Sequence, residues 1–464
     1  MIVQSKKKFT AATPIHAVDS GSFADAVGSA SALTQRWLAS VAFQARPDTH
    51  ALVPDAAGKL DSVWAGVRGT AHPWSLAALP KALPPGTYRM GEQGLAIDPE
   101  AAAFSWSLGA YVFDRYKPST AKPRTLVLAP SEAVDRGVRI AQAVAATRNL
   151  INTPAEHLGP AELADAVKGV AKQHDAKFRQ VVDDALLKSG FPAIHAVGRA
   201  ATRAPRLIEL TWGKASHPLL TLVGKGVCFD SGGLDIKSAD GMRQMKKDMG
   251  GAANALALAS LVMAHRLPVR LQLLIPAVEN AIAGNAYRPG DVFKTRQGLH
   301  IEIGNTDAEG RVILCDALAY GAEGQPDLMI DMATLTGAAR VALGSQLPAL
   351  FCRDMSLARG LVDRGLRMHD PLWHLPLWRD YHAGIESEVA DIVNTGRSAL
   401  AGAINAAIFL EDFVPADIDW LHIDLFAWND AARPGRPVGG DAQTVRTLLA
   451  FLEERYPRRA GQAT

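Results

Sequence analysis

Three polar clusters in the sequence could carry chemistry, and the most informative one occupies residues 305–311. It reads Asn-Thr-Asp-Ala-Glu-Gly-Arg, so one residue separates the carboxylates of Asp307 and Glu309. An extended backbone would point both carboxylates to the same side, and Gly310 lets the chain turn closely before Arg311 opens the next helix. By itself, an Asp-x-Glu pair before a helix is more often an N-terminal cap than a catalytic site.

The other two clusters lie upstream. Residues 223–233 contain Lys225 and Asp230, and a second group pairs Lys237 with Asp248. Oxygen ligands from several loops suit one or two divalent cations such as Mn²⁺, Mg²⁺ or Zn²⁺. The Gly-Lys-Gly segment lacks the spacing of a P-loop, so phosphate binding is a weak alternative, and Lys237 alone would ordinarily be a solvated surface residue. Each cluster is ambiguous alone, but the combination favours a site.

Alternating strands and helices are predicted to position these clusters, because short apolar runs alternate with longer periodic segments. The predicted strands are residues 219–223, 271–278, 299–303 and 328–332, and the predicted helices are residues 133–150, 250–265 and 312–320. Such alternation favours a largely parallel sheet covered on both sides. Ligands of these sheets bind in loops at the carboxyl ends of strands, which is where the polar clusters lie.

A chain of 464 residues is long enough for two domains. In the N-terminal third, residues 101–116 predict a helix with aromatic side chains on one face, and residues 117–123, polar with two prolines, are a linker candidate. We therefore predict the α/β class. A smaller α/β N-terminal domain would occupy residues 1–123, and residues 124–464 would form a C-terminal domain whose mixed, largely parallel sheet has helices on both faces.

Composition excludes several classes of protein. A hydrophobic content of 48% with 21% charged residues is typical of a folded soluble chain, and the net charge of +2 demands no polyanionic partner. Residues 1–125 carry 13 basic and 9 acidic side chains, a mild excess that a solvated face explains as well as a partner does. The three cysteines form no CxxC pair, which favours a reducing compartment. The lysines at 6–8 precede no apolar segment, and no apolar run could span a membrane, so we expect a cytoplasmic protein.

Taken together, the clusters resemble the leucyl aminopeptidase family, also called the cytosol aminopeptidases. Residues 305–311 match the whole signature heptad of that family. Further blocks match it in order and spacing, namely residues 223–233 with Lys237, residues 247–249, residues 287–291 and residues 331–337. The resemblance runs from about residue 134 to residue 452. It is faint or absent over the N-terminal third, which looks shorter than the family's usual leading domain.

This resemblance implies a metal-dependent aminopeptidase that uses two divalent ions per subunit, Mn²⁺ or Zn²⁺, with Mg²⁺ as a further choice. Asp230 and Glu309 would bridge the two ions. Asp307 would complete one metal site, and Lys225 with Asp248 would complete the other. Lys225 would have to be neutral to act as a ligand, because an ammonium group has no lone pair.

The resemblance also assigns roles to residues that are not metal ligands. Lys237 and Arg311 would be catalytic, with Lys237 stabilising the oxyanion and Arg311 holding a bicarbonate ion that serves as general base. Two nearby cations can convert a bridging water to hydroxide at neutral pH and bind a free α-amine, which would restrict cleavage to the N-terminal residue of a peptide. Met245, Thr334 and Gly337 match the family's pocket for the first side chain, and a Met wall favours apolar residues such as Leu or Met.

One segment departs from the family pattern. Where members commonly read His-x-Asp-Ile-Ala-Gly-x-Ala-Trp, this chain has a shorter segment, residues 422–428, that includes Phe426. We predict a narrowed or reshaped pocket. Four further acidic or basic residues in helix and strand patterns are interpreted as structural: Asp316, Asp331, His422 and Asp424.

Two other functions compete with the peptidase. One is a weakly active homologue that serves as a binding or DNA-associated scaffold, and the other is a two-metal phosphohydrolase. Every predicted ligand position and both catalytic positions hold chemically competent residues, which argues against the scaffold, and the lysine ligand argues against phosphate chemistry. The expected partners are peptides with a free N-terminus, with no membrane and no nucleic acid. The resemblance further implies a homohexamer.

Overall fold

The computed structural model describes residues 1–5 and 11–458, and these fall into two compact units. The first unit comprises Met1–Ala145 with Ala431–Val438, and the second comprises Ala146–Asp430 with Gly439–Thr464. The first unit thus includes residues 124–145 and 431–438, which the predicted boundary after residue 123 places in the C-terminal domain. The lysines at residues 6–8 lie outside the described residues.

The first unit is built on a six-stranded sheet with the order β1-β6-β5-β2-β4-β3. All its neighbours are parallel except β3 and β4. Its strands are β1 Ile2–Gln4, β2 Thr13–Val18, β3 His50–Pro54, β4 Leu60–Gly66, β5 Gly86–Met90 and β6 Arg124–Leu128. Its helices are α1 Phe23–Gly28, α2 Ala32–Ser40, α3 Leu79–Ala82, α4 Pro99–Gly109 and the first part of α5 Glu132–Asn152. The strand β6 joins this sheet because it pairs with β1 and β5, although it follows the predicted linker.

The predicted helix over residues 101–116 is wrong at its C-terminal end. Helix α4 ends at Gly109, where an added Cβ atom would lie 2.3 Å from the carbonyl oxygen of Ala77, so the chain makes a close backbone contact at that point. Two of the aromatic residues of the predicted face lie within the helix and are buried. Phe104 packs against Trp74 with ring centroids 5.2 Å apart, and Trp106 packs against Tyr88 at 5.9 Å.

The second unit contains a nine-stranded sheet with the order β16-β15-β18-β14-β9-β11-β8-β7, and β10 pairs with β11 as well. Its strands are β7 Lys177–Val182, β8 Arg206–Trp212, β9 Leu219–Gly224, β10 Gly226–Asp230, β11 Arg270–Asn280, β14 Leu328–Ala333, β15 Ala349–Cys352, β16 Trp373–His374 and β18 Trp420–Asp424. The central pairs β18–β14, β14–β9 and β9–β11 are parallel, whereas β7–β8, β8–β11 and β15–β18 are antiparallel. The predicted mixed, largely parallel sheet is confirmed.

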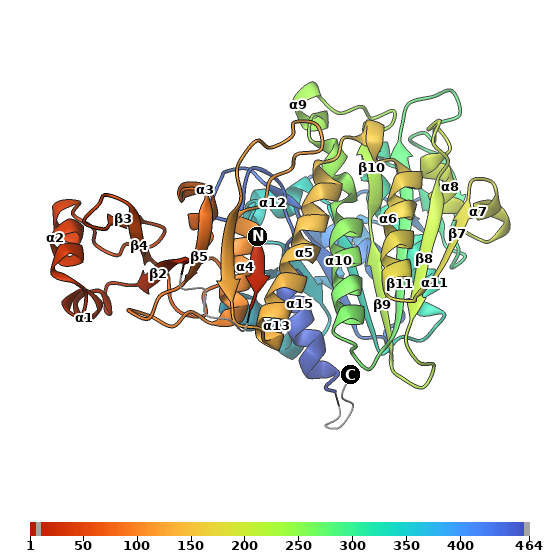
Figure 1. Ribbon diagram of the computed structural model, residues 1–464. Helices are drawn as coiled ribbons and strands as arrows, with labels where there is room; N and C mark the ends of the chain where they lie inside the picture. The colour runs from red at the N-terminus through yellow and green to blue at the C-terminus, as the bar shows by residue number, and fades with distance from the viewer. Residues whose placement is uncertain (6–10, 459–464) are drawn as a thin grey trace. The chain divides into compact units, whose positions relative to one another are not determined.

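Helices cover both faces of this sheet (Figure 1). The helices are α6 Pro160–Gln173, α7 Ala185–Lys188, α8 Pro192–Gly198, α9 Ala239–Met242, α10 Gly250–Ala264, α11 Glu309–Ala322, α12 Gly337–Leu343, α13 Met355–Arg367, α14 Gly402–Glu411 and α15 Val445–Arg455. An added Cβ atom on Gly224 of β9 would meet α10, whereas Thr221 of β9 touches α11, so these two helices lie on opposite faces. Two small sheets complete the unit, β12 Val292–Lys294 with β13 His300–Glu302 and β17 Ile392–Val393, and β19 Trp428–Asn429 with β20 Gly439–Gly440.

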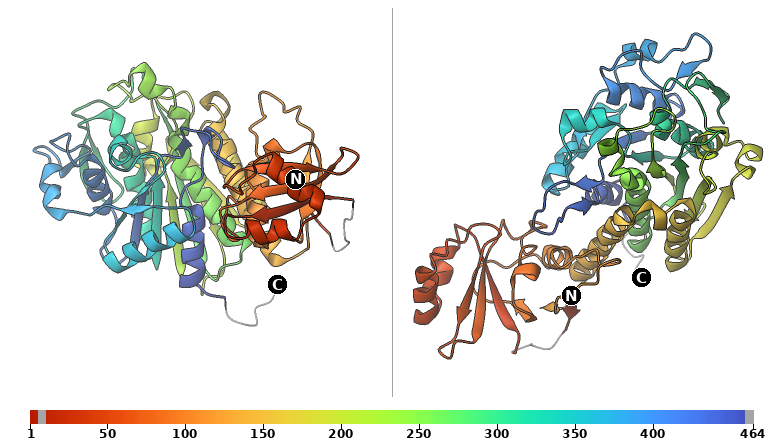
Figure 2. Two further views of the ribbon diagram at one scale, coloured as in Figure 1. Left: turned by 90° about the vertical axis from the view of Figure 1, so that its left-hand side faces the viewer. Right: turned by 90° about the horizontal axis from the view of Figure 1, so that it is seen from above.

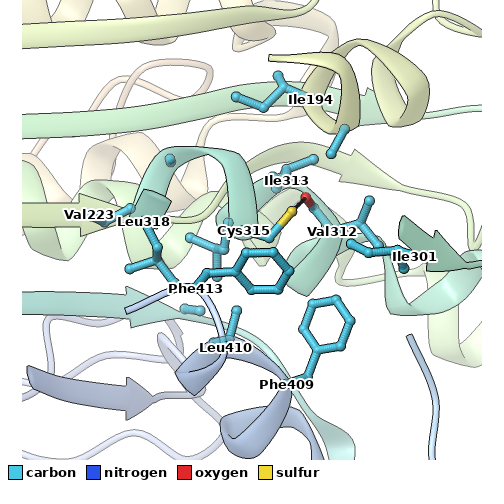
Figure 3. Packing of buried hydrophobic residues seen from close by; sticks show 14 of the residues in the cluster. Ile194, Val223, Ile301, Val312, Ile313, Cys315, Leu318, Phe409, Leu410 and Phe413 are labelled. Carbon is cyan, nitrogen blue, oxygen red and sulfur yellow. Dashed lines mark hydrogen bonds between the residues drawn. The ribbon is translucent and has the colours of Figure 1, made fainter. Parts of the chain in front are cut away.

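Both faces of the central strands are buried, as near-continuous apolar runs in parallel sheets predict. On the α11 side a large cluster joins Val223 of β9 with Val312 and Ile313 of α11 and Phe409 and Phe413 on and beside α14 (Figure 3). The three cysteines are buried free thiols. Among the described residues, no helix is both long enough and apolar enough to cross a membrane.

Because β9, β10, β11, β14 and β18 run in the same direction, their carboxyl ends lie at one edge of the sheet. Lys225 directly follows β9, Asp230 ends β10 and Thr334 directly follows β14. Asn280 ends β11, and Asp424 ends β18. The fold therefore gathers polar side chains from distant parts of the sequence at one edge. Figure 2 shows the ribbon from two further sides.

The contact between α10 and β14 predicts a sensitive glycine. An added Cβ atom on Gly251 would lie 2.1 Å from the carbonyl oxygen of Met332, so Gly251→Ala must push helix and strand apart and should lower the free energy of unfolding by about 1–3 kcal/mol. The control is Gly169→Ala in α6, where nothing lies within 4 Å and the gain in helix propensity should stabilise the protein by about 0.5–1 kcal/mol. Urea denaturation measures both, and equal stability of the two variants would contradict the packing.

Candidate active site

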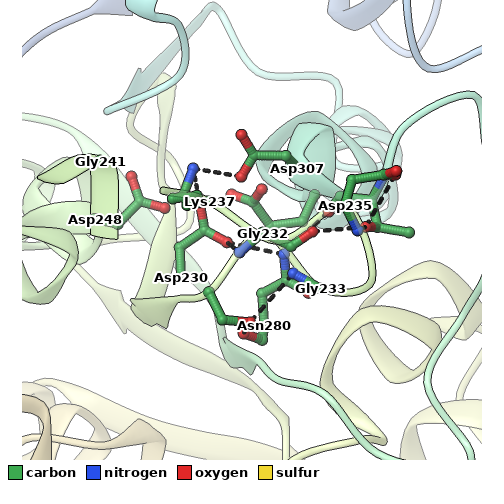
Figure 4. Close-up of polar contacts among 12 residues, drawn as sticks. Asp230, Gly232, Gly233, Asp235, Lys237, Gly241, Asp248, Asn280 and Asp307 are labelled. Carbon is green, nitrogen blue, oxygen red and sulfur yellow. Dashed lines mark hydrogen bonds and ion pairs between the residues drawn. The ribbon is translucent and has the colours of Figure 1, made fainter. Parts of the chain in front are cut away.

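The predicted acidic residues meet at the carboxyl edge of the sheet (Figure 4). Carboxylate oxygens of Asp230, Asp307 and Glu309 all lie within 4.8 Å of one another. Asp248 joins them from the 3-10 helix η2 Met245–Met249, which precedes α10. Asp230 and Glu309 are buried, whereas the side chain of Asp307 keeps 34% of its exposure. The group is thus open to the solvent from the side of Asp307.

Two lysines connect these carboxylates. The ammonium of Lys225 lies 2.8 Å from Asp248 Oδ2 and 2.8 Å from Glu309 Oε1, and it donates a 2.9 Å hydrogen bond to the carbonyl oxygen of Thr334. The ammonium of Lys237 lies 2.8 Å from Asp230 Oδ2 and also contacts Asp307. In Figure 4 Lys237 stands between Asp230 and Asp307. The structure therefore brings all four predicted acids and both predicted lysines into one site.

The backbone at residues 306–308 differs from the extended conformation expected from the sequence. Thr306–Ala308 form a 3-10 turn, η3, and the side chain of Asn305 accepts a hydrogen bond of 2.6 Å from the amide of Asp307. Helix α11 then begins at Glu309. The two carboxylates still converge, because the turn brings Asp307 beside the first residue of α11. The same segment is therefore a helix cap and part of the site.

Crowding shifts the pKa values of the acids. Burial and the neighbouring charge of Asp230 raise the pKa of Glu309 to about 8, against the opposing charge of Lys225. The same two causes raise the pKa of Asp307 to about 6, although Lys237 opposes them. Lys225 behaves in the opposite way, since burial disfavours its ammonium but the charges of Asp248 and Glu309 outweigh burial and raise its pKa. The acids thus require more positive charge than the two lysines provide.

The residues present fit a divalent cation. Glu309 is 1% exposed, and its Oε2 atom has no hydrogen-bond partner among the described residues. Carboxylate oxygens are the ligands that Mn²⁺ and Mg²⁺ prefer, and carboxylates also bind Zn²⁺. A buried carboxylate oxygen without a donor is costly unless a cation compensates it. The donor set, its spacing and its uncompensated charge therefore all match a metal centre.

Arg311 lies apart from the lysine–acid network. Its guanidinium is 9% exposed and makes no hydrogen bond or ion pair with the described residues, and its Nε atom is fully buried. Burial lowers the pKa of Arg311 to about 10, although the charges of Glu309 and Asp424 oppose that shift. A guanidinium remains protonated at neutral pH even so. Arg311 therefore keeps its charge, and it is not among the residues that line the cavity beside the acids.

A layer behind the carboxylates was not predicted from the sequence, and it consists of two uncharged donors, Asn280 and Tyr287, and the carboxylate of Asp235. The amide of Asn280 donates to Asp230 Oδ1 at 2.8 Å and to the carbonyl oxygen of Thr306 at 3.0 Å. Tyr287 donates to the same carbonyl at 2.5 Å, and Asp235 accepts from the amide of Thr306 at 2.7 Å. Asn280 lies two residues beyond the predicted strand 271–278, so the expectation that polar residues after strand ends form the site could have indicated it as well.

The predicted pocket residues Met245, Thr334 and Gly337 line one cavity together with the acids. Its volume is about 620 Å³. Thr334 also orients Asp248, because its hydroxyl lies 2.8 Å from Asp248 Oδ1. Phe426 also lines the cavity. The departure of residues 422–428 from the family pattern had predicted a reshaped pocket, and Phe426 belongs to that segment.

Asp424 and its neighbours shape the far wall of this cavity. Asp424 accepts hydrogen bonds from the amides of Leu335 and Thr336 and from the hydroxyl of Thr336, which positions the segment that precedes α12. Behind it, His422 and Trp420 both bond to the buried carboxylate of Asp331, at 2.6 and 2.8 Å. Asp316, on α11, accepts from the amides of Ala193, Ile194 and Arg296. These contacts agree with the structural interpretation of all four residues.

Comparison with known proteins identifies the family. The sequence model of the cytosol aminopeptidase family, catalytic domain, matches residues 145–449, and that of the M17 aminopeptidase N-terminal domain matches residues 13–129. This chain therefore belongs to the cytosol aminopeptidase family, which is a family of peptidases. The expectation that the resemblance fades over the N-terminal third is wrong, because the second match covers most of that region.

Individual relatives support the assignment. A probable cytosol aminopeptidase of Roseiflexus castenholzii is 42% identical over 367 residues, which cover 75% of this chain and 74% of that protein. The crystal structure of a cytosol aminopeptidase from Coxiella burnetii is similar with a TM-score of 0.93 and 47% identity, over 98% of this chain and 99% of that chain. The bottromycin maturation enzyme BotP in complex with Mn is similar with a TM-score of 0.87 and 32% identity, over 96% and 100% of the two chains.

The raised pKa of Glu309 predicts how the metal-free protein responds to pH. The folded state holds the proton of Glu309 more tightly than the unfolded state does, so this stabilising contribution is fully present below about pH 4.5 and is lost as pH rises through about 8. Denaturation of chelator-treated protein between pH 5 and 9 should show the decline, and Glu309→Gln should show a smaller one because glutamine does not ionise. Parallel curves for the two proteins would refute the assignment. Added Mn²⁺ should stabilise the unmodified protein most at high pH.

Proposed function

We propose that this aminopeptidase binds two divalent cations, Mn²⁺ or Zn²⁺ with Mg²⁺ as a further choice, through Lys225, Asp230, Asp248, Asp307 and Glu309. The convergence of three carboxylates within 4.8 Å, beside two further charged ligands and a cavity, carries the proposal. When bound, such a pair of cations supplies activation of a water molecule and of the scissile carbonyl. Lys225 would contribute its nitrogen lone pair after losing a proton to solvent, a loss that cations in contact with Asp248 and Glu309 favour.

The two catalytic side chains have separate roles in this proposal. Lys237 stays protonated, because Asp230 and Asp307 raise the pKa of its ammonium, and it can donate a hydrogen bond to the oxyanion that develops on the scissile carbonyl. Among the described residues the guanidinium of Arg311 has no hydrogen-bond acceptor, which suits a planar anion such as bicarbonate held near the acids. That anion would accept the proton released by the attacking water.

The substrates in this proposal are peptides with a free N-terminus. In this proposal the acid cluster binds the α-amine, and Met245, Thr334 and Gly337, which line the same cavity, contact the first side chain. The flexible, polarisable wall of Met245 favours apolar first residues such as Leu or Met. A homohexamer and a cytoplasmic location remain proposals drawn from the family resemblance.

Hydrolysis of blocked and unblocked substrates tests the reaction. With Mn²⁺ present, leucyl p-nitroanilide should be cleaved at least about a hundredfold faster than its N-acetylated form, because acetylation removes the amine that the acid cluster binds. Chelation should abolish the activity and added metal should restore it. Equal rates on the two amides would sink the exopeptidase proposal, and faster cleavage of p-nitrophenyl phosphate would favour phosphohydrolase chemistry.

The position of Phe426 predicts a specificity change. Phe426→Ala should enlarge the cavity and raise kcat/KM for phenylalanyl p-nitroanilide by about tenfold relative to the leucyl substrate, since the removed ring leaves room for a larger side chain. Phe413→Leu, in the apolar cluster on the α11 side, is a matched control because Phe413 does not line the cavity. An unchanged ranking of Leu, Met and Phe substrates in Phe426→Ala would show that Phe426 does not limit the pocket.

A further inference from the structure

Two cationic side chains lie over the ring of Phe426 at the cavity wall. The ammonium of Lys247 is 4.7 Å from the ring centroid, and the guanidinium carbon of Arg340 is 4.9 Å from it. All three residues line the same cavity as the acid cluster. A cation over an aromatic face is stabilised by about 0.5–2 kcal/mol, but the ring satisfies none of the N–H donors.

Among the described residues, neither cation is in direct contact with a carboxylate, although Asp248 and Asp424 lie near enough to Lys247 to act on its charge. The side chains of Lys247 and Arg340 make no ion pair and no hydrogen bond within the part of the chain that the structure describes, although Lys247 is only 6% exposed. The nearby acids are engaged elsewhere. Lys225 pairs with Asp248, and Asp424 accepts three hydrogen bonds from the backbone and hydroxyl groups before α12. Asp240 also lines the cavity, but it is exposed on α9.

A buried ammonium without a counter-charge is costly, and a ligand carboxylate is the group that best compensates it. Lys247 directly precedes Asp248 on η2, whereas Arg340 comes from α12. Both nevertheless face the cavity in which Met245 provides an apolar wall. The cavity therefore offers an apolar surface for methylene groups and two unpaired cations for a charged end.

We propose that Lys247 and Arg340 bind a carboxylate of the peptide substrate, so that the enzyme accepts an N-terminal glutamate in addition to apolar first residues. This inference rests on the proposed aminopeptidase function. A glutamate side chain has two methylene groups for the apolar wall and a carboxylate for the cations. The C-terminal carboxylate of a short peptide has the same chemistry and is the second source that the experiment separates.

The sharpest test compares glutamate with glutamine, which has nearly the same shape without the charge. In the metal-loaded full-length enzyme, kcat/KM for glutamyl p-nitroanilide should exceed that for glutaminyl p-nitroanilide. Lys247→Met should lower this Glu:Gln ratio by about tenfold or more, because it removes a charge-assisted hydrogen bond, and Arg340→Met should lower it in the same direction. These substrates carry no C-terminal carboxylate, so only the side chain can respond.

The matched control is Lys246→Met. Lys246 is the neighbour of Lys247 on η2, but its ammonium donates to the carbonyl oxygen of Asn152 at 2.7 Å and does not line the cavity. The Glu:Gln ratio should therefore stay unchanged. A comparison of leucyl-glycine with leucyl-glycinamide reports on the C-terminal source, since only the first has that carboxylate. Loss of either carboxylate preference in Lys247→Met, but not in Lys246→Met, supports the proposal and names the source.

Binding of free amino acids separates this inference from the proposed reaction. Calorimetry should show tighter binding of glutamate than of glutamine to the unmodified protein, and Lys247→Met should remove the difference, whether or not any amide is hydrolysed. Two results together would overturn the carboxylate site alone while leucyl p-nitroanilide is still turned over. They are equal Glu and Gln values in both assays, and a preference for leucyl-glycine over leucyl-glycinamide that Lys247→Met leaves unchanged. Absence of turnover on every unblocked amide would overturn the proposed function, and the calorimetric difference would then decide the carboxylate site by itself.

Discussion

The site depends on one electrostatic constraint, which is that four carboxylates share a small volume at the edge of a sheet with only two lysines among them. Lys225 and Lys237 each lie between two of these acids, yet Glu309 still has a raised pKa and an oxygen without a donor. Like charges this close cannot all ionise unless more positive charge arrives. This cluster of carboxylates therefore suits a metal-binding site, in which cations compensate the charge, and is poorly suited to a purely structural role.

The surrounding fold maintains that arrangement against its own repulsion. Parallel central strands deliver Lys225, Asp230 and Asn280 to the same edge. The turn before α11 then adds Asp307 and Glu309, and its carbonyl at Thr306 accepts bonds from both Asn280 and Tyr287. Uncharged donors behind the acids hold them in place without neutralising them. This layer preserves the charge that a cation would compensate.

The same cavity contains two regions of opposite character. Near the sheet edge the acids attract positive groups, which suits metal ions and an α-amine. At the wall formed by Phe426, Lys247 and Arg340 carry unpaired positive charge, which suits an anionic group. A peptide has an amine at its N-terminus, and an acidic first residue adds a carboxylate a few bonds away. Charge complementarity would thus select the first residue of the substrate at one wall of the cavity, and it would also hold cations at the acid cluster.

The sequence by itself determined the α/β class, the main strands of the second unit and the six charged residues that meet at the sheet edge. Strand periodicity and the heptad at 305–311 involve residues that are close in sequence, so they can be recognised without three-dimensional contacts. Only the tertiary structure decided how far α4 extends, which sheet β6 joins, and that Asp307 precedes α11 in a 3-10 turn. It also showed that Lys247 and Arg340 meet at Phe426. Those features depend on contacts between residues distant in sequence, and no local pattern encodes such contacts.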